Sequence, residues 1–203
     1  MQLYHSPTTP FGRKVMVVIL ETGLIDRVEV ISVMGTPVDP GSLPVAQNPL
    51  GKIPVLVTDQ GQSIYDSRVI CRYLDDLTGA GLYGAGPSLW DTLVLEATAD
   101  GILDAGVLMT YEQRVRPEDK RHAPWVDGQW AKAARALDHL EQTAATALAG
   151  PLTMGQIALG CALPYLDFRH AARDWRATRP ALTAWEAQFA TRPAMQATKP
   201  PVS

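Results

Sequence analysis

An acidic residue and a hydroxyl residue stand side by side at the predicted start of a helix, in Tyr65-Asp66-Ser67-Arg68. As a structural feature, Ser67 is a good helix N-cap, and Asp66 suits the positive end of the helix dipole. The same groups could instead bind a ligand, because free N–H groups and the Ser67 hydroxyl can donate to a carboxylate while Asp66 pairs with an ammonium group. Such a site would recognise the free end of an amino acid, which carries both charges on one carbon.

A second candidate is Asn48 to Pro54, NPLGKIP, which joins two predicted strands and ends in an Ile-Pro bond. An ordinary trans proline would fit the first residue of a strand. If the Ile53–Pro54 bond is cis, the N–H and C=O of Ile53 turn outward, and an extended peptide can add to them through main-chain hydrogen bonds. Because only about 5–6% of X-Pro bonds are cis, the tripeptide alone favours the trans form.

A third candidate is HSPTTPFGRK, His5 to Lys14, where Thr8 and Thr9 lie between two prolines and directly before an apolar helical pattern. Pro10 fits the first helical position, where its missing N–H costs nothing and its fixed φ favours the helix. Thr9 is therefore expected at the N-cap position, with its hydroxyl at the N-terminal end of the helix.

The elements that position these loops change character midway along the chain. In the first part, β-branched and alternating runs predict strands, and apolar spacing predicts two helices: strands at 2–5, 28–33, 54–58 and 63–65, helices at 11–22 and 67–77. After a glycine-rich stretch, helices are predicted over 88–114, 127–148, 153–166 and 180–190. We therefore expect an α/β domain over 1–78, a linker at 79–87 and an all-α helical-bundle domain over 88–203.

Composition excludes several classes of protein. The chain has 203 residues, 46% of them hydrophobic, and a formal net charge of −3, which argues for a globular protein without a nucleic-acid-binding face. No apolar run approaches the ~20 residues of a membrane helix, and the N-terminus has no secretory pattern. Cys71 and Cys161 stand far apart in apolar helical contexts, so we expect buried thiols in a reducing cytoplasm and no metal site.

The loops together resemble a known signature. NPLGKIPVLV, followed by a short turn and YDSRVICRYLDD, is similar to the glutathione-site signature of the cytosolic glutathione transferases, and the resemblance spans essentially the whole chain. TRPAMQATKP near the end is similar to a bacterial branch of that family. The resemblance implies a thioredoxin-like first domain, an all-helical second domain, glutathione as a substrate, and commonly a homodimer.

The resemblance also implies roles for the loop residues. Ile53 would give its backbone N–H and C=O to the cysteinyl part of glutathione, with Pro54 in the cis form. Asp66 and Ser67 would hold the γ-glutamyl end, which is the free amino acid end inferred above. Lys52 would reach the glycyl carboxylate, although a solvated loop lysine is an equally good reading of that residue.

Thr9 matches the position before Pro-Phe where several classes of the family place a catalytic cysteine or serine. A free thiol has a pKa of about 8.5, and a hydrogen bond worth ~1.5–3 kcal/mol to the charged form lowers that pKa by roughly one to two units. The helix N-terminus at Phe11 adds a favourable dipole, and Arg13 can add charge. The alternative donors to the sulfur are Ser6, Thr8 and Tyr4.

For the second domain the resemblance implies an electrophile pocket, for which we expect Met109, Tyr111 and Arg114 on the first long helix. Side chains at such spacing are also typical of a helical core. Thr153 and Gln156 fit a capping box, which we interpret as structural.

The expected function is conjugation of the glutathione thiolate to a small electrophilic, hydrophobic substrate, a detoxification chemistry. The alternative is a non-catalytic glutathione-transferase-like binding or regulatory protein. A thioredoxin-type reductase is excluded, because position 9 carries no thiol and no C-x-x-C motif is present.

Overall fold

The computed structural model describes residues 1–201 and divides the chain into two compact units. Unit 1 comprises Met1–Tyr83 together with the C-terminal segment from Pro193, and unit 2 comprises Gly84–Arg192. Unit 1 carries the small mixed sheet and unit 2 is helical, so the predicted fold class is confirmed. Within residues 1–201, no helix is both long and apolar enough to cross a membrane.

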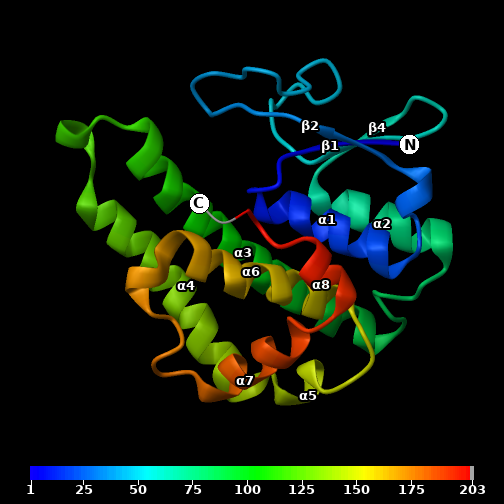
Figure 1. Ribbon diagram of the computed structural model, residues 1–203. Helices are drawn as coiled ribbons and strands as arrows, with labels where there is room; N and C mark the ends of the chain where they lie inside the picture. The colour runs from blue at the N-terminus through cyan, green and yellow to red at the C-terminus, as the bar shows by residue number, and fades with distance from the viewer. Residues whose placement is uncertain (202–203) are drawn as a thin grey trace. The chain divides into compact units, whose positions relative to one another are not determined.

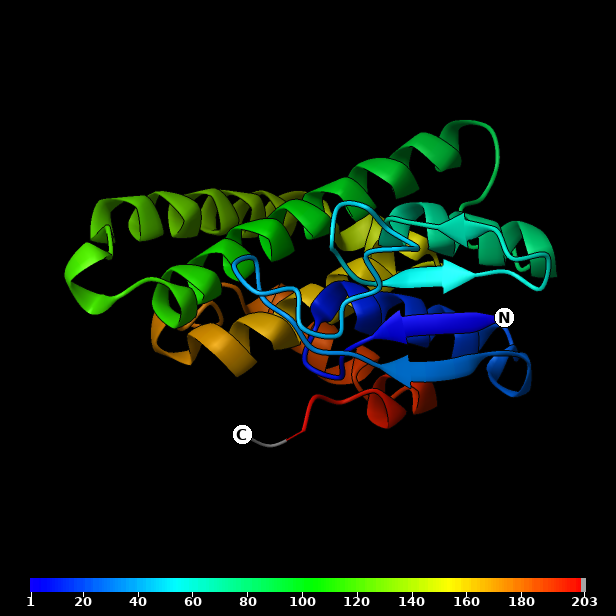
Figure 2. The ribbon, with the colours of Figure 1, turned by 90° about the horizontal axis from the view of Figure 1, so that it is seen from above.

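The sheet of unit 1 has four strands in the order β2-β1-β3-β4. β1 (Gln2–His5) and β2 (Glu29–Ser32) are parallel and are connected through α1 (Pro10–Glu21). β3 (Val55–Val57) runs antiparallel to β1 and forms a hairpin with β4 (Ser63–Ile64). In Figure 2 the arrows of β1 and β2 point the same way and that of β3 points the opposite way. The βαβ unit and the hairpin predicted from sequence are both present.

One face of this sheet is covered by α1 and α2 (Ser67–Thr78), which also pack against each other (Figure 1). Side chains alternate along β1, so Leu3 and His5 are buried whereas Gln2 and Tyr4 are only half-buried. The core between the layers consists of fully buried aliphatic side chains: Leu3, Leu56, Val15, Val18, Ile19, Ile70 and Leu74. Tyr4 therefore lies on the opposite face of β1 from His5.

The C-terminal segment joins unit 1 through a buried arginine. Arg13 of α1 donates from Nη2 to the Met195 carbonyl at 3.1 Å and from Nε to Thr198 Oγ1 at 3.3 Å. Met195 lies in α8 (Pro193–Ala197), a short helix that periodicity could not predict. The sequence suggests that the positive charge of Arg13 lowers the pKa of a bound thiol. In the structure the guanidinium bonds to the C-terminal segment instead.

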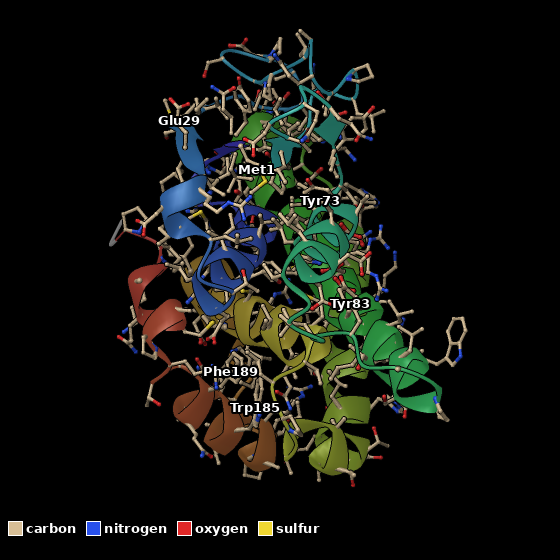
Figure 3. All side chains as sticks on the ribbon, turned by 90° about the vertical axis from the view of Figure 1, so that its right-hand side faces the viewer. Met1, Glu29, Tyr73, Tyr83, Trp185 and Phe189 are labelled. Carbon is tan, nitrogen blue, oxygen red and sulfur yellow. The ribbon has the colours of Figure 1, made fainter. Side chains whose placement is uncertain are left out.

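Unit 2 consists of α3 (Pro87–Val115), α4 (Ala123–Thr143), α5 (Ala145–Leu148), α6 (Met154–His170) and α7 (Pro180–Phe189), with three-residue 3₁₀ turns at 118–120 and 171–173. α6 is buried nearly all round and lies mainly against α3, as its continuous apolar sequence predicts. Gly160 of α6 leaves room for Phe189, whose ring stacks on Trp185 with centroids 4.7 Å apart (Figure 3).

The capping box that begins α6 is confirmed. Thr153 Oγ1 accepts from the Gln156 N–H, and Gln156 Oε1 accepts from the Thr153 N–H, both at 3.3 Å. Thr153→Ala is expected to lower the free energy of unfolding by about 1 kcal/mol, because a first-turn N–H loses its acceptor. Denaturant titration measures this loss. Thr98→Ala, at a half-buried position inside α3, is the matched control and should be near neutral; equal effects at the two positions would contradict a capping role.

Candidate functional site

One buried side chain holds the loop before β3. Asn48 donates from Nδ2 to the Lys52 carbonyl at 2.9 Å, and its Oδ1 accepts from the Leu50 N–H at 3.0 Å. Gly51 has φ +60°, a conformation that favours glycine. The NPLGKIP motif thus specifies a loop closed by its own asparagine, with the Lys52 side chain exposed.

The Ile53–Pro54 bond is cis, so the trans form favoured by the tripeptide alone is wrong and the form implied by the resemblance is present. β3 begins at Val55, and Ile53 lies outside its ladder. Within residues 1–201, neither the N–H nor the C=O of Ile53 has a hydrogen-bond partner. The half-buried backbone of Ile53 is therefore available to an added extended peptide.

Asp66, rather than Ser67, is the N-cap of α2, which corrects the sequence interpretation. Asp66 has extended backbone angles, its Oδ1 accepts from the Arg68 N–H at 3.1 Å, and its Oδ2 lies 3.0 Å from Arg68 Nη2. Aspartate caps a helix as well as serine does, so the sequence could not choose between them. The Tyr65–Asp66 bond is a cis peptide, for which the sequence carries no indication.

Ser67 is consequently the first helical residue and is only 3% exposed. Its N–H is one of the groups that a helix start leaves unpaired. Neither that N–H nor the hydroxyl has a hydrogen-bond partner in the described part of the chain. Two donors at the positive end of α2 therefore remain for a carboxylate.

The Asp66 carboxylate carries the complementary charge. Partial burial raises the pKa of Asp66, but the hydrogen bond and charge of Arg68, together with the charge of Lys14, lower it overall. Asp66 is therefore ionised at neutral pH. A carboxylate beside two free donors matches the two charges of an amino acid end.

Thr9 is the N-cap residue of α1, with Pro10 at the first helical position, as the sequence predicts. Its side chain does not cap the helix: the hydroxyl donates to the Ser6 carbonyl at 2.8 Å, which also accepts from the Thr9 N–H at 3.0 Å. The N–H groups of Phe11 and Gly12 have no partner among residues 1–201. The first turn of α1 thus offers two backbone donors beside a hydroxyl whose hydrogen is already engaged.

His5 is a neighbour of Thr9 that the sequence interpretation left without a role. It is 8% exposed, and its Nδ1 has no hydrogen-bond partner in the described residues. Burial lowers the pKa of His5, against a raising contribution from the Ser6 backbone, so the ring is neutral at neutral pH. Alternation along β1, which places His5 on the same buried face as Leu3, was the pattern that could have identified it.

Gly12 explains how His5 and Thr9 fit together. A Cβ built on Gly12 would lie 2.6 Å from Thr9 Oγ1 and 3.0 Å from His5 Nδ1. Both side chains therefore pack against the bare Cα of Gly12, a residue for which the sequence alone indicates no role in the site.

The alternative sulfur donors occupy different places in unit 1. Ser6 Oγ and Thr8 Oγ1 lie 3.3 Å apart in the loop that Thr9 closes. Tyr4 lies on the other face of β1 from His5. Ser6 and Thr8 thus share the environment of Thr9, and Tyr4 does not.

In unit 2, the residues proposed for the electrophile lie along α3. Met109 is 1% exposed, Tyr111 is half-buried, and Arg114 is exposed. Of the three, Tyr111 and Arg114 present accessible polar groups. Cys71 and Cys161 are buried in different units and form no disulfide. The described residues contain no group of three or more His, Cys, Asp or Glu placed to hold a metal ion.

Comparison with known proteins agrees with this geometry. Residues 8–77 match the glutathione S-transferase N-terminal domain family, and residues 123–187 match the C-terminal domain family. An uncharacterized GST-like protein of Escherichia coli K12, YibF, is 36% identical over 206 residues, which cover 99% of both chains.

Solved structures extend the match. A glutathione transferase family member from Pseudomonas fluorescens Pf-5, crystallised with bound glutathione, has a TM-score of 0.96 and 45% identity over 99% of each chain. A further crystal structure from the same organism, with bound S-(propanoic acid)-glutathione, has a TM-score of 0.92 and 44% identity over 100% of each chain. Because the similarity in sequence and in fold runs the length of the chain, the protein belongs to the glutathione S-transferase superfamily.

Proposed function

We propose that the protein is a glutathione transferase that conjugates the thiolate of glutathione to a small hydrophobic electrophile. The observation that carries the proposal is a set of groups in unit 1: the unpaired backbone of Ile53, the two unpaired donors of Ser67 and the ionised carboxylate of Asp66, which Arg68 also contacts. Each is complementary to a part of glutathione. Bound glutathione in the relative from Pseudomonas fluorescens supports the assignment.

In this proposal the tripeptide lies along the start of β3. Its cysteinyl N–H and C=O pair with the backbone of Ile53, as in strand addition. The α-carboxylate of its γ-glutamyl end accepts from Ser67, and its ammonium group pairs with Asp66. Lys52, whose side chain is exposed, reaches the glycyl carboxylate.

The thiolate is stabilised at the start of α1. The Phe11 N–H donates to sulfur without breaking any bond within the described residues, and the helix dipole adds to its effect. The Thr9 hydroxyl becomes a second donor when it exchanges the Ser6 carbonyl for the sulfur. The thiol loses its proton to solvent, and an electron pair of the sulfur forms the bond to the electrophilic carbon of the acceptor while the leaving group departs from that carbon with the electron pair of the broken bond.

In this proposal the acceptor lies against Tyr111 and Arg114 of α3, whereas Met109, which is 1% exposed, packs in the core of unit 2. A cytoplasmic homodimer is the assembly that the resemblance implies, and size-exclusion chromatography with light scattering tests the dimer.

The role of Thr9 is tested through the pKa of the bound thiol, followed by the ultraviolet absorbance of the thiolate as pH is varied. In the parent protein this pKa is expected to fall roughly one to two units below the free value of about 8.5. Thr9→Ala should raise it by a similar amount and Thr9→Ser should restore it. Thr8→Ala is the matched control, because Thr8 is the neighbouring threonine of the same loop.

The outcomes separate binding from catalysis. Absence of glutathione binding by calorimetry would overturn the proposed function as a whole. Binding with an unchanged thiol pKa in Thr9→Ala would overturn only the role of Thr9 and would assign the thiolate to the Phe11 N–H.

The engagement of the Thr9 hydroxyl by Ser6 favours one alternative, a protein that binds glutathione without conjugating it. Binding of glutathione together with no turnover on a panel of neutral and anionic electrophiles would support this alternative.

A further inference from the structure

One buried imidazole in unit 1 has a ring nitrogen without a partner. His5 ends β1, its side chain is 8% exposed, and its Nδ1 forms no hydrogen bond within residues 1–201. The other buried histidine of the described chain, His170 in unit 2, is 7% exposed, yet its Nε2 lies 2.8 Å from the Gly106 carbonyl and 3.3 Å from Thr110 Oγ1. The fold thus pairs one buried imidazole and leaves Nδ1 of the other unpaired.

Packing alone gives no reason for a histidine at position 5. A buried donor or acceptor without a partner loses its hydrogen bonds to water and gains none in return. Leu3 lies on the same face of β1 and is fully buried, so an apolar side chain would fit this environment without that loss. Because most buried polar groups are paired and the exceptions gather at functional sites, the unpaired Nδ1 points to a function.

The unpaired nitrogen lies beside the hydroxyl of Thr9. His5 Nδ1 is 3.0 Å, and Thr9 Oγ1 is 2.6 Å, from the point where a Cβ on Gly12 would stand. The two atoms are therefore less than two hydrogen-bond lengths apart. The backbones of both residues are held in place, since the His5 carbonyl accepts from the Val33 N–H and the Thr9 N–H donates to the Ser6 carbonyl, both at 3.0 Å. Small rotations of the two side chains are thus sufficient to bring Nδ1 and Oγ1 into contact.

The two side chains are complementary as donor and acceptor. The Thr9 hydroxyl gives its hydrogen to the Ser6 carbonyl, and its oxygen accepts no hydrogen bond within the described residues. A neutral imidazole carries a hydrogen on one ring nitrogen and a lone pair on the other. Burial lowers the pKa of His5, so the ring is neutral while a bound thiol ionises. With its hydrogen on Nδ1, His5 is the donor that the Thr9 oxygen lacks.

We propose that His5 is a positioning residue for the thiolate: its Nδ1–H donates to Thr9 Oγ1 and so strengthens the hydrogen bond that the Thr9 hydroxyl donates to the sulfur of bound glutathione. A hydrogen bond accepted by a hydroxyl polarises its O–H group, which makes that group a better donor. The Ser6 carbonyl keeps the Thr9 N–H when the hydroxyl turns to the sulfur, so it does not lose its last partner. The inference rests on the proposed function and assigns a further residue to the same site.

The test follows the pKa of the bound glutathione thiol through the ultraviolet absorbance of the thiolate. His5→Leu, which removes both ring nitrogens, is expected to raise this pKa by about half a unit to one unit, the effect of one neutral hydrogen bond. Its midpoint of chemical denaturation should stay the same or rise, because an apolar side chain replaces an unpaired polar one. A purely structural role of His5 predicts the opposite pair of results, an unchanged thiol pKa and a lower midpoint.

Two amide variants show which ring nitrogen acts. Asparagine places its amide near the position of Nδ1, whereas the amide of glutamine reaches the position of Nε2. His5→Asn should therefore keep the thiol pKa of the parent protein, and His5→Gln, the matched control, should raise it as His5→Leu does. Equal thiol pKa values in the two amide variants would overturn the inference, and this comparison decides should His5→Leu fail to fold.

A double-mutant cycle with Thr9→Ala shows whether His5 acts through the hydroxyl. In the Thr9→Ala background, His5→Leu is expected to leave the thiol pKa unchanged, because no hydroxyl remains to be polarised. The inference is wrong if the shift is equal in both backgrounds, if His5→Leu alone causes no shift, or if Thr9→Ala alone causes none; each of these results leaves the proposed function standing. If calorimetry shows that the parent protein does not bind glutathione, the proposed function fails and this inference fails with it.

Discussion

Replacing Asp66 with asparagine is expected to weaken glutathione binding by about tenfold to a hundredfold, while α2 still forms. The loss follows from removing the charged partner of the glutathione ammonium group, since hydrogen bonds to charged groups contribute ~1.5–3 kcal/mol. Asparagine caps helices as well as aspartate, so the bond from the Arg68 N–H is kept. Isothermal titration calorimetry gives the two affinities, and thermal melting checks that the fold is intact.

A glutathione analogue without the α-amino group shows whether charge is the cause. The parent protein and Asp66→Asn should bind this analogue equally, because neither complex then contains the ammonium–carboxylate pair. If Asp66→Asn instead binds the analogue more weakly than the parent protein does, by the same factor as for glutathione, the loss comes from a disturbed start of α2. The proposed pairing of Asp66 with the glutathione ammonium group would then be wrong. Ser67→Ala should weaken both ligands alike, because Ser67 meets the carboxylate end.

Local patterns in the sequence were sufficient to predict most of the helices and strands. β1 is predicted to the residue, and α1, α2 and α3 begin and end within one residue or two of their predicted bounds. The reason is physical: proline at a first helical position, glycine after a last turn and alternation in short strands act over a few residues. Asp66 and Ser67 were found in the same way, because they stand at the start of α2, and Ile53 was found from the proline that comes directly before β3.

Long-range contacts set the limit of that prediction. The sequence offered Arg13 as charge for a thiol, yet its guanidinium bonds to Met195 and Thr198, more than 180 residues away. The choice of Asp66 over Ser67 as cap, and the engagement of Thr9 by Ser6, depend on backbone angles that residue types leave open. These contacts change which groups remain free for a ligand, so they change the chemistry of the site more than its location.

Gly12→Ala is expected to lower the free energy of unfolding by about 1–2 kcal/mol, although alanine is normally favoured over glycine in a helix by about 0.5–1 kcal/mol. The reason is the buried contact: the new methyl group would lie 2.6 Å from Thr9 Oγ1 and 3.0 Å from the His5 ring, so both side chains must shift. Gly128→Ala, in exposed α4 with no atom within 4 Å of its new Cβ, should instead gain about 0.5–1 kcal/mol. Chemical denaturation of both variants measures the contrast; equal stabilisation would show that His5 and Thr9 are loosely packed.

The same variant separates the two donors proposed for the thiolate. Gly12→Ala moves the Thr9 hydroxyl but keeps the Phe11 N–H at the start of α1, because that N–H is fixed by the helix backbone. A bound thiol whose pKa rises by one unit or more in this variant depends on the hydroxyl. If the pKa of the bound thiol is unchanged, the helix N-terminus stabilises the thiolate. Threonine is then acceptable at position 9 because its side chain has no role in catalysis.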